Sequence, residues 1–189
     1  MKMTTIYFVR HSIRDVSVHN SVTAPLTPKG RELARQLADF FVDKDITAIH
    51  CSPYQRAVDT LLPTARSLQL DIRLHDNLRE RNIGMWMDDF ATFAEKQWRN
   101  LDYSLQGGES LQEVAVRMID AVDRIARNSS GNVIIGGHAT AFSILFQYVF
   151  EVDGYSMFQT MSMPDVFCAR WDGYRLTSLT HVRIPSLTA

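Results

Sequence analysis

The stretch Thr4–Ser12 reads TTIYFVRHS, and the predicted fold is built around it. Its run Ile6–Val9 has the apolar, β-prone composition of a buried strand. Arg10 and His11 follow this run without a spacer. Open α/β sheets bind their ligands beyond the carboxyl ends of the strands, so this strand end is a candidate site. The simpler interpretation is a strand end that becomes polar where it reaches solvent.

The 189 residues have an ordinary globular composition, with 46% hydrophobic and 22% charged residues, which suits one domain over residues 1–189. The net charge of −1 disfavours a nucleic-acid partner, which usually requires a basic face. The two cysteines, Cys51 and Cys168, fit a reducing compartment. The first residues have too short an apolar stretch for a signal peptide. No apolar run approaches the roughly 20 residues that span a bilayer, so we expect a cytoplasmic protein without a membrane partner.

Helix-like and strand-like segments alternate after the first strand. Thr27-Pro28 and Ser52-Pro53 each combine an N-cap residue with a proline, which is typical of helix starts. Pro63 should kink the second of these helices or cut it short. Periodicity predicts strands at 46–50, 71–74 and 132–135, and helices at about 28–43, 54–68, 111–127 and 142–149. Two β-prone runs around Asp172-Gly173 predict a closing hairpin at 166–171 and 174–181. Together these elements predict a three-layer α/β/α sandwich with a mostly parallel, mixed sheet.

The segment from Met85 to Tyr103 is rich in aromatic residues, including Trp86, Phe90, Phe93 and Trp98. The simpler interpretation is a helix that packs these rings on the core. The functional interpretation is a lid or a pocket wall beside the site.

Polar groups gather at three predicted strand ends, which carry Arg10-His11, Arg56 and His138, while a charged loop carries Glu80. If the three strands are parallel neighbours, these groups converge on one edge of the sheet. Arginine forks suit phosphate oxygens, and helix N-termini add N–H donors. One neutral imidazole can attack phosphorus, while the second imidazole or the carboxylate handles the leaving-group proton. The set therefore fits phosphoryl transfer with no metal and no cofactor.

The motifs around these residues resemble, in their order, those of the histidine phosphatase superfamily, which has a phosphoglycerate-mutase-like fold. They extend from Tyr7 to His138 and read VRHS, LTPKG, CSPYQRAVDT, LRERNIGMW, GES and GGHA. Each motif alone is weakly specific, whereas the ordered set is highly specific.

The resemblance implies a role for each central residue. His11 matches the phosphorylated nucleophile, and Arg10 and Arg56 match the arginines that bind the phosphoryl group. His138 matches the second histidine, which contacts the same group. Glu80 matches the proton donor to the leaving group.

Four positions depart from the family pattern. Ser12 stands where the family usually has glycine, and Ala139 stands where glycine is frequent after the second histidine. Arg14 and Ser17 occupy positions where Thr and Asn often touch phosphate. Ser17 can still donate a hydrogen bond, and Arg14 either adds a third positive charge to the pocket or points to solvent. These changes affect substrate and rate more than reaction class.

The length of the segment after the Glu80 loop favours a phosphatase over a mutase. Mutases that the chain resembles usually carry an inserted segment here, whereas 22 residues (positions 85 to 106) separate Gly84 from Gly107. Arg81 follows Glu80 as in mutases and keeps that alternative open, although it also fits a solvated loop charge. We expect a phosphatase for a small phosphorylated substrate. The sequence indicates neither the substrate nor the oligomeric state.

Other functions are less well supported. Four residues separate Cys51 from Arg56, one fewer than the loop of cysteine phosphatases needs, and Pro53 removes an N–H donor. The altered loop also fits a pseudo-enzyme that binds a phosphorylated ligand without turnover. Three further histidines lack metal-ligand spacing and are more often surface or hydrogen-bonded residues: His19, His75 and His181.

Overall fold

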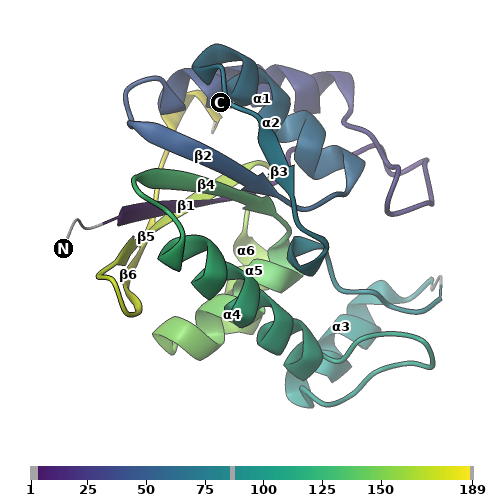
Figure 1. Cartoon of the computed structure of the whole chain (residues 1–189). Helices are drawn as coiled ribbons and strands as arrows, with labels where there is room; N and C mark the ends of the chain where they lie inside the picture. Colours follow the sequence, from purple (N-terminus) through teal and green to yellow (C-terminus); the bar gives the residue numbers. More distant parts are fainter. Residues whose placement is uncertain (1–3, 86–87, 188–189) are drawn as a thin grey trace.

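The computed structural model describes residues 4–85 and 88–187, in which six strands form one sheet in the order β3-β2-β4-β1-β5-β6 (Figure 1). The strands are β1 (Thr4–Arg10), β2 (Ile46–Cys51), β3 (Ile72–Leu74), β4 (Asn132–Gly137), β5 (Asp165–Trp171) and β6 (Leu176–His181). The strands β3, β2, β4 and β1 are parallel, and β5 pairs antiparallel with β1 and with β6. The mostly parallel, mixed sheet and the closing hairpin are therefore confirmed.

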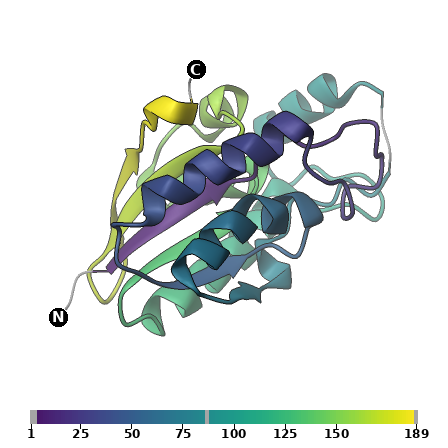
Figure 2. The same cartoon turned by 90° about the horizontal axis from the view of Figure 1, so that it is seen from above.

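Helices cover both faces of the sheet. They are α1 (Pro28–Phe41), α2 (Gln55–Leu68), α3 (Phe90–Arg99), α4 (Leu111–Arg127), α5 (Ala139–Phe150) and α6 (Gly154–Thr160), with short 3-10 helices η1 (Asp76–Leu78) and η2 (Pro185–Leu187). Figures 1 and 2 show α1 and α2 on one face, with α4, α5 and α6 on the other. This arrangement is the predicted three-layer sandwich. None of the helices in the described ranges is long and apolar enough to cross a membrane.

The first strand contributes to both hydrophobic cores because its side chains alternate between the two faces. Ile6 and Phe8 pack with the residues under α4 and α5, where the Phe8 ring meets Phe146 edge-on at 5.1 Å between centroids. Val9 packs with Leu37 and the other residues under α1 and α2. The predicted buried strand is thus the central element between two cores.

The start of α1 follows the predicted capping chemistry, whereas the predicted cap Ser52-Pro53 does not begin α2, whose N-cap is Tyr54 with no side-chain cap hydrogen bond. The interior of α2 differs from the prediction as well. Thr27 Oγ1 accepts a hydrogen bond from the Gly30 N–H at 3.0 Å, and Pro28 begins α1. In α2 the helix continues through Pro63 to Leu68, so the expectation that proline cuts it short is wrong. Leu61 and Ala65 on either side are buried. We attribute the intact helix to this packing, which offsets a cost of about 3 kcal/mol for an interior proline.

One helix lies outside the sequence-based prediction. The N-cap of the short helix α6 is Asp153, whose carboxylate accepts a hydrogen bond from the Ser156 N–H at 3.0 Å. This N-cap is a local signal that could have marked the helix.

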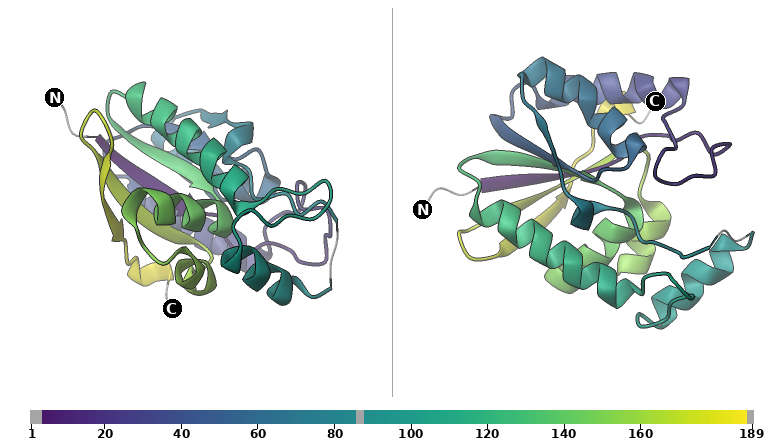
Figure 3. Two further views of the ribbon diagram at one scale, coloured as in Figure 1. Left: turned by 90° about the horizontal axis from the view of Figure 1, so that it is seen from below. Right: turned by 45° about the vertical axis from the view of Figure 1, so that its right-hand side comes forward.

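Two segments lie beyond the carboxyl ends of the parallel strands, as Figures 1 and 3 show: the loop over residues 12–27 and the chain around α3. Phe93 and Trp98 of α3 are buried, as the packed-helix interpretation predicts. Phe90 is 40% exposed and lines a cavity, as the pocket-wall interpretation predicts. Trp86 lies outside the described residues.

Candidate active site

The ends of β1, β2 and β4 align the residues that follow them. The N–H of His11 donates to the carbonyl oxygen of Gly137 at 3.0 Å, and the N–H of Ser52 donates to that of Gly136 at 2.9 Å. The imidazole rings of His11 and His138 have centroids 5.3 Å apart. The sheet therefore brings the two predicted histidines together, because the strands that carry them are parallel neighbours.

The hydrogen bonding and burial of His11 define its protonation state. Its Nδ1 lies 2.7 Å from the carbonyl oxygen of Ser12. Since a carbonyl can only accept, we assign the proton to Nδ1, which leaves a lone pair on Nε2. Burial, followed by the charge of Arg56, holds the pKa of His11 well below its usual range, although the Ser12 carbonyl acts in the opposite direction. The neutral imidazole with a free Nε2 is the form that a nucleophile requires.

Ser12, at the position where the family that the chain resembles usually has glycine, is completely buried and hydrogen-bonded. Its N–H donates to Thr60 Oγ1 at 2.8 Å, and its hydroxyl donates to the Gly30 carbonyl at 2.8 Å. Thr60 in turn donates to the carbonyl of Arg56 at 2.7 Å. The serine hydroxyl therefore ties the loop after His11 to the start of α1, and it does not disturb the alignment of the strand ends.

Two arginines are oriented by backbone carbonyls at the same edge. Arg10 Nη1 donates to the carbonyls of Met161 and Ser162, the latter at 3.2 Å. Arg56 Nη1 donates to the carbonyl of Ser21. In the described part of the chain the Nε atoms of both arginines are buried without a hydrogen-bond partner. Burial lowers the pKa of Arg56 to about 10, which still leaves a cation at neutral pH. Both guanidinium groups thus keep N–H donors for a ligand anion.

The carboxylate of Glu80 lies at the N-terminus of α5, the helix that follows β4. Its Oε1 accepts from the backbone N–H groups of Arg81 and Ala141 at 2.8 and 3.1 Å. Its Oε2 accepts from the N–H of Thr140 at 3.2 Å. Because His138 is the N-cap of the same helix, α5 positions both Glu80 and His138 at one place.

An arginine on α4 holds the loop that carries Glu80. Arg117 Nη1 donates to the carbonyls of Asn77 and Arg79 at 2.9 Å each, and Nη2 donates to the carbonyl of Glu80 at 3.3 Å. The guanidinium also forms hydrogen bonds of 2.8 and 3.0 Å with Glu109, which pairs with Arg79 as well. The backbone around Glu80 is therefore fixed by a network that does not depend on a ligand.

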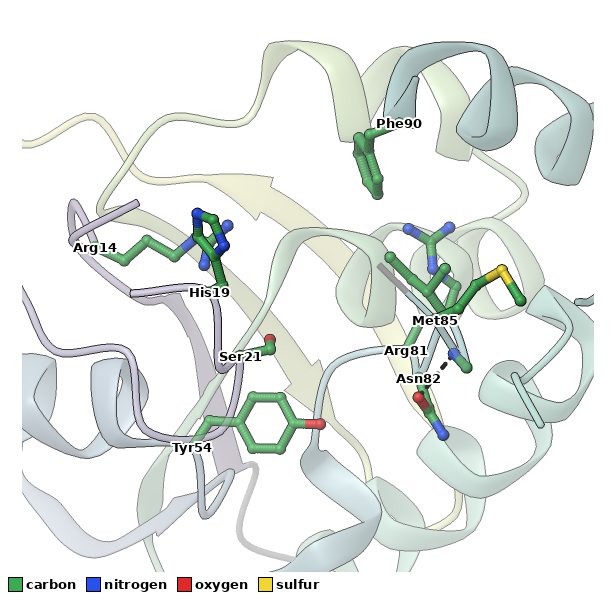
Figure 4. A pocket seen from close by; sticks show the side chains of 10 residues that line it. Arg14, His19, Ser21, Tyr54, Arg81, Asn82, Met85 and Phe90 are labelled. Atoms are coloured by element: carbon green, nitrogen blue, oxygen red, sulfur yellow. Dashed lines mark hydrogen bonds between the residues drawn. The ribbon is translucent and has the colours of Figure 1, made fainter. Parts of the chain in front are cut away.

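A cavity of about 450 Å³ adjoins this edge (Figure 4). It is lined by Arg14, His19, Ser21, Tyr54, Arg81, Asn82, Ile83, Gly84, Met85 and Phe90. Tyr54 joins the cavity to the site, because its ring meets His138 edge-on at 5.2 Å and lies 5.0 Å from the Arg56 guanidinium. No carboxylate is among the side chains that line the cavity in the described ranges, so it suits an anionic ligand.

Arg81 is buried, so the interpretation of a solvated loop charge is wrong. The residue is 5% exposed, and its guanidinium lies 5.4 and 5.1 Å from the ring centroids of Phe90 and Phe93. Nη1 donates to Gln97 Oε1 at 2.5 Å. Its Nε is buried and has no hydrogen-bond partner among the described residues.

The remaining predicted site residues lie in different places. Arg14 lines the cavity, in agreement with a further positive charge at the pocket rather than one pointing to solvent. Ser17 is exposed, donates to the Asp15 carboxylate at 2.6 Å and is not among the residues that line the cavity. Ala139 is buried as the first residue of α5. The structure therefore brings Arg14 to the cavity, while the hydroxyl of Ser17 is engaged by Asp15.

Sequence reasoning missed several residues that contact the central groups. Ser52 hydrogen-bonds to His138, Tyr54 contacts His138 and Arg56, and Ser21 accepts from Arg56. Ser52 and Tyr54 directly follow a strand that was predicted to end at the site, and this placement was the available signal. Ser21 carried no comparable signal because it reaches Arg56 from a distant loop.

The structure also bears on the cysteine-phosphatase alternative and on the remaining histidines. Cys51 is completely buried, and burial raises the pKa of its thiol, which is the opposite of what a cysteine nucleophile needs. His75 Nε2 lies 2.8 Å from His50 Nδ1, and His181 Nε2 lies 2.7 Å from the Asp165 carboxylate. These two contacts agree with hydrogen-bonded histidines. No cluster of three or more His, Cys, Asp or Glu residues suited to a metal ion occurs in the described ranges.

A family model for the histidine phosphatase superfamily (branch 1) matches residues 6–180. A bifunctional protein of Mycobacterium tuberculosis is 32% identical over 117 residues, which cover 56% of this chain and 32% of that protein. The chain thus matches only about a third of the length of this curated relative. A probable phosphoglycerate mutase of Enterobacter sp. is 28% identical over 168 residues, or 82% of this chain and 78% of that protein.

Solved structures share the fold at low sequence identity. A mycobacterial glucosyl-3-phosphoglycerate phosphatase has a TM-score of 0.76 at 19% identity, covering 95% of this chain and 97% of that one. A phosphoglycerate mutase of Bacillus anthracis has a TM-score of 0.76 at 19% identity, covering 96% and 93%. The expected phosphoglycerate-mutase-like fold is therefore confirmed.

Proposed function

Because the chain belongs to branch 1 of the histidine phosphatase superfamily, we propose that it hydrolyses phosphomonoesters without a metal, through a phosphohistidine on His11. The observation that carries the proposal is the hydrogen bond between His11 Nδ1 and the Ser12 carbonyl, which places the lone pair of the imidazole on Nε2. Arg10 and Arg56 supply N–H donors for the phosphoryl oxygens at the same edge.

In the first step the Nε2 lone pair of His11 forms a bond to phosphorus, and the bond from phosphorus to the ester oxygen breaks. The leaving alkoxide takes a proton from Glu80, which therefore enters the step as the acid. Arg10, Arg56 and His138 stabilise the charge on the phosphoryl oxygens. The products of this step are the alcohol and phosphorylated His11.

In the second step water attacks the phosphorus of phosphorylated His11. The Glu80 carboxylate accepts a proton from that water, and the bond between phosphorus and His11 Nε2 breaks. The sum of both steps converts one phosphomonoester and one water into an alcohol and inorganic phosphate. His11 and Glu80 return to their starting states.

A phosphoglycerate mutase-type transfer is the second candidate, favoured by the burial of Arg81 beside the cavity. A mutase returns the phosphoryl group to a bound acceptor and must exclude water. The chain between Gly84 and Gly107 contains one described helix, α3, of 10 residues. So short a segment offers little to exclude water from the site, which favours hydrolysis over return of the phosphoryl group to a bound acceptor.

The decisive assay is hydrolysis of p-nitrophenyl phosphate in the presence of a chelator, comparing the native protein with His11→Ala. We expect turnover that survives the chelator and disappears in the variant, because the nucleophile is the imidazole. Acid-labile phosphate on the native protein, trapped with a labelled substrate, should be absent from His11→Ala.

Other results lead to different conclusions. Loss of turnover with the chelator contradicts metal independence. If neither protein hydrolyses the ester, a phosphoglycerate isomerisation assay separates a mutase from a pseudo-enzyme that only binds phosphorylated ligands.

A further inference from the structure

Ser52 lies at the end of β2 and contacts the second histidine of the site. It is completely buried, and its Oγ lies 2.7 Å from His138 Nε2. Its own N–H donates to the Gly136 carbonyl at 2.9 Å, which anchors the serine to β4, the strand that precedes His138. The serine and the histidine are thus held by neighbouring strands of one sheet.

The hydroxyl of Ser52 has one proton, and its surroundings decide where that proton points. Its Oγ accepts a hydrogen bond from the Tyr54 N–H at 3.3 Å. Among the described residues the other hydrogen-bond partner of the hydroxyl is His138 Nε2. A buried hydroxyl proton needs an acceptor, and the imidazole nitrogen is the available one. The Ser52 hydroxyl therefore donates to His138 Nε2.

This donation determines the tautomer of His138. Burial, followed by the charge of Arg56, holds the pKa of His138 well below its usual range, so the ring is neutral and has a single N–H. If Nε2 accepts from Ser52, the proton of His138 lies on Nδ1. That Nδ1 is completely buried and has no hydrogen-bond partner in the described part of the chain. A buried donor without a protein partner is suited to a ligand acceptor.

We propose that Ser52 is a positioning residue that holds His138 in the Nδ1–H tautomer, so that His138 donates this proton to a phosphoryl oxygen. The role of this donor in turnover rests on the proposed function. In the opposite tautomer Nδ1 presents a lone pair, which repels phosphoryl oxygens. Nothing in the proposed steps requires His138 to give up its proton, so it acts as a hydrogen-bond donor throughout.

The tautomer can be read directly from the resting protein by long-range proton–nitrogen correlation spectra of the histidines. The His138 signals are identified by their loss in His138→Asn. We expect a protonated Nδ1 and an unprotonated Nε2 in the native protein. Inorganic phosphate should shift the Nδ1 signal, because the phosphate oxygen becomes its acceptor. A proton on Nε2 in the native protein would overturn the proposal, whatever the activity.

Variants test whether Ser52 is the cause. In Ser52→Ala we expect His138 to lose its single tautomer, and kcat on p-nitrophenyl phosphate to fall on the order of tenfold, less than the ~10² expected for removing a donor outright. Ser52→Thr retains a hydroxyl, so His138 should keep the native tautomer in this variant. Ser143→Ala is the matched control, because Ser143 is a buried serine on α5 whose hydroxyl has no partner among the described residues.

The two readouts separate this proposal from the hydrolase proposal. An unchanged His138 tautomer in a folded Ser52→Ala variant contradicts the role of Ser52. An Nδ1–H tautomer with no hydrolysis supports the role of Ser52 in holding His138 and counts against the hydrolase.

Discussion

Arg56 is a buried cation whose hydrogen-bond partners in the described part of the chain are neutral. Its Nη1 donates to a backbone carbonyl, and its Nε has no partner among those residues. The Glu80 carboxylate acts on this charge through space, but no carboxylate among the described residues is hydrogen-bonded to it. A buried guanidinium in this state is costly, which indicates that the fork is held for an anion. We expect Arg56→Ala to lower turnover by on the order of 10² or more, because one charge-stabilising donor is lost. Kinetics on p-nitrophenyl phosphate check this. Arg66→Ala, an exposed arginine on the same helix, is the control, and near-native turnover of Arg56→Ala would exclude Arg56 from the site.

Glu80 is the proposed acid, and its role depends on the leaving group. In Glu80→Gln the side chain cannot give a proton, so hydrolysis of alkyl phosphates, whose leaving group must be protonated, should fall strongly. The loss on p-nitrophenyl phosphate should be smaller, because that leaving group departs as a stable anion. Measuring kcat/KM on both esters tests the role, and equal losses would argue against it.

At the scale of elements, α4 holds the loop of the site through Arg117, whose side chain is 10% exposed in its pair with Glu109 at 15%. Arg117→Met leaves three loop carbonyls and the Glu109 carboxylate with fewer donors. We expect the free energy of unfolding to fall by about 2 kcal/mol. Activity on alkyl phosphates should fall as well, because the backbone of Glu80 loses a hydrogen bond.

Chemical denaturation and alkyl-phosphate kinetics measure both effects of Arg117→Met. Arg124→Met on the same helix is the control, since the Arg124 side chain is 75% exposed and pairs with exposed Asp120. If the two variants behave alike, the network around Arg117 does not stabilise the loop.

At the scale of the whole molecule, buried neutral histidines make stability depend on pH. Burial lowers the pKa of His50 to about 4, and the pKa values of His11, His75 and His138 are also lowered. In the unfolded chain histidines titrate near 6.5, so below that pH the unfolded state binds more protons than the native state. The free energy of unfolding should therefore fall as the pH drops from about 7 to 5.

Urea denaturation at several pH values measures this dependence. The variant His50→Gln lacks one of these groups and should show a smaller fall between pH 7 and 5. A native protein equally stable at both ends of that range would show that the histidines are not held neutral by the fold.

Sequence and structure agree where the information is local. Strand and helix periodicity and the capping residue Thr27 act within a few positions, so the main elements were predictable. Pro63 does not end α2, because the packing of the helix outweighs the local preference, and a kink at this residue stays a prediction. For Arg81 the interpretation as a solvated charge was wrong, because the guanidinium packs on the rings of Phe90 and Phe93 in α3.

The sequence by itself determined the order of the elements, the mixed sheet and the family, because periodicity, capping and ordered motifs are all written in neighbouring residues. It also identified His11 and His138 as residues at parallel strand ends. Only the tertiary structure decided that Arg81 is buried against Phe90 and Phe93, and that Ser52 meets His138. The first contact joins a loop to the separate helix α3, and the second joins positions 86 residues apart in the chain. Contacts of this kind arise from packing, which no local pattern specifies.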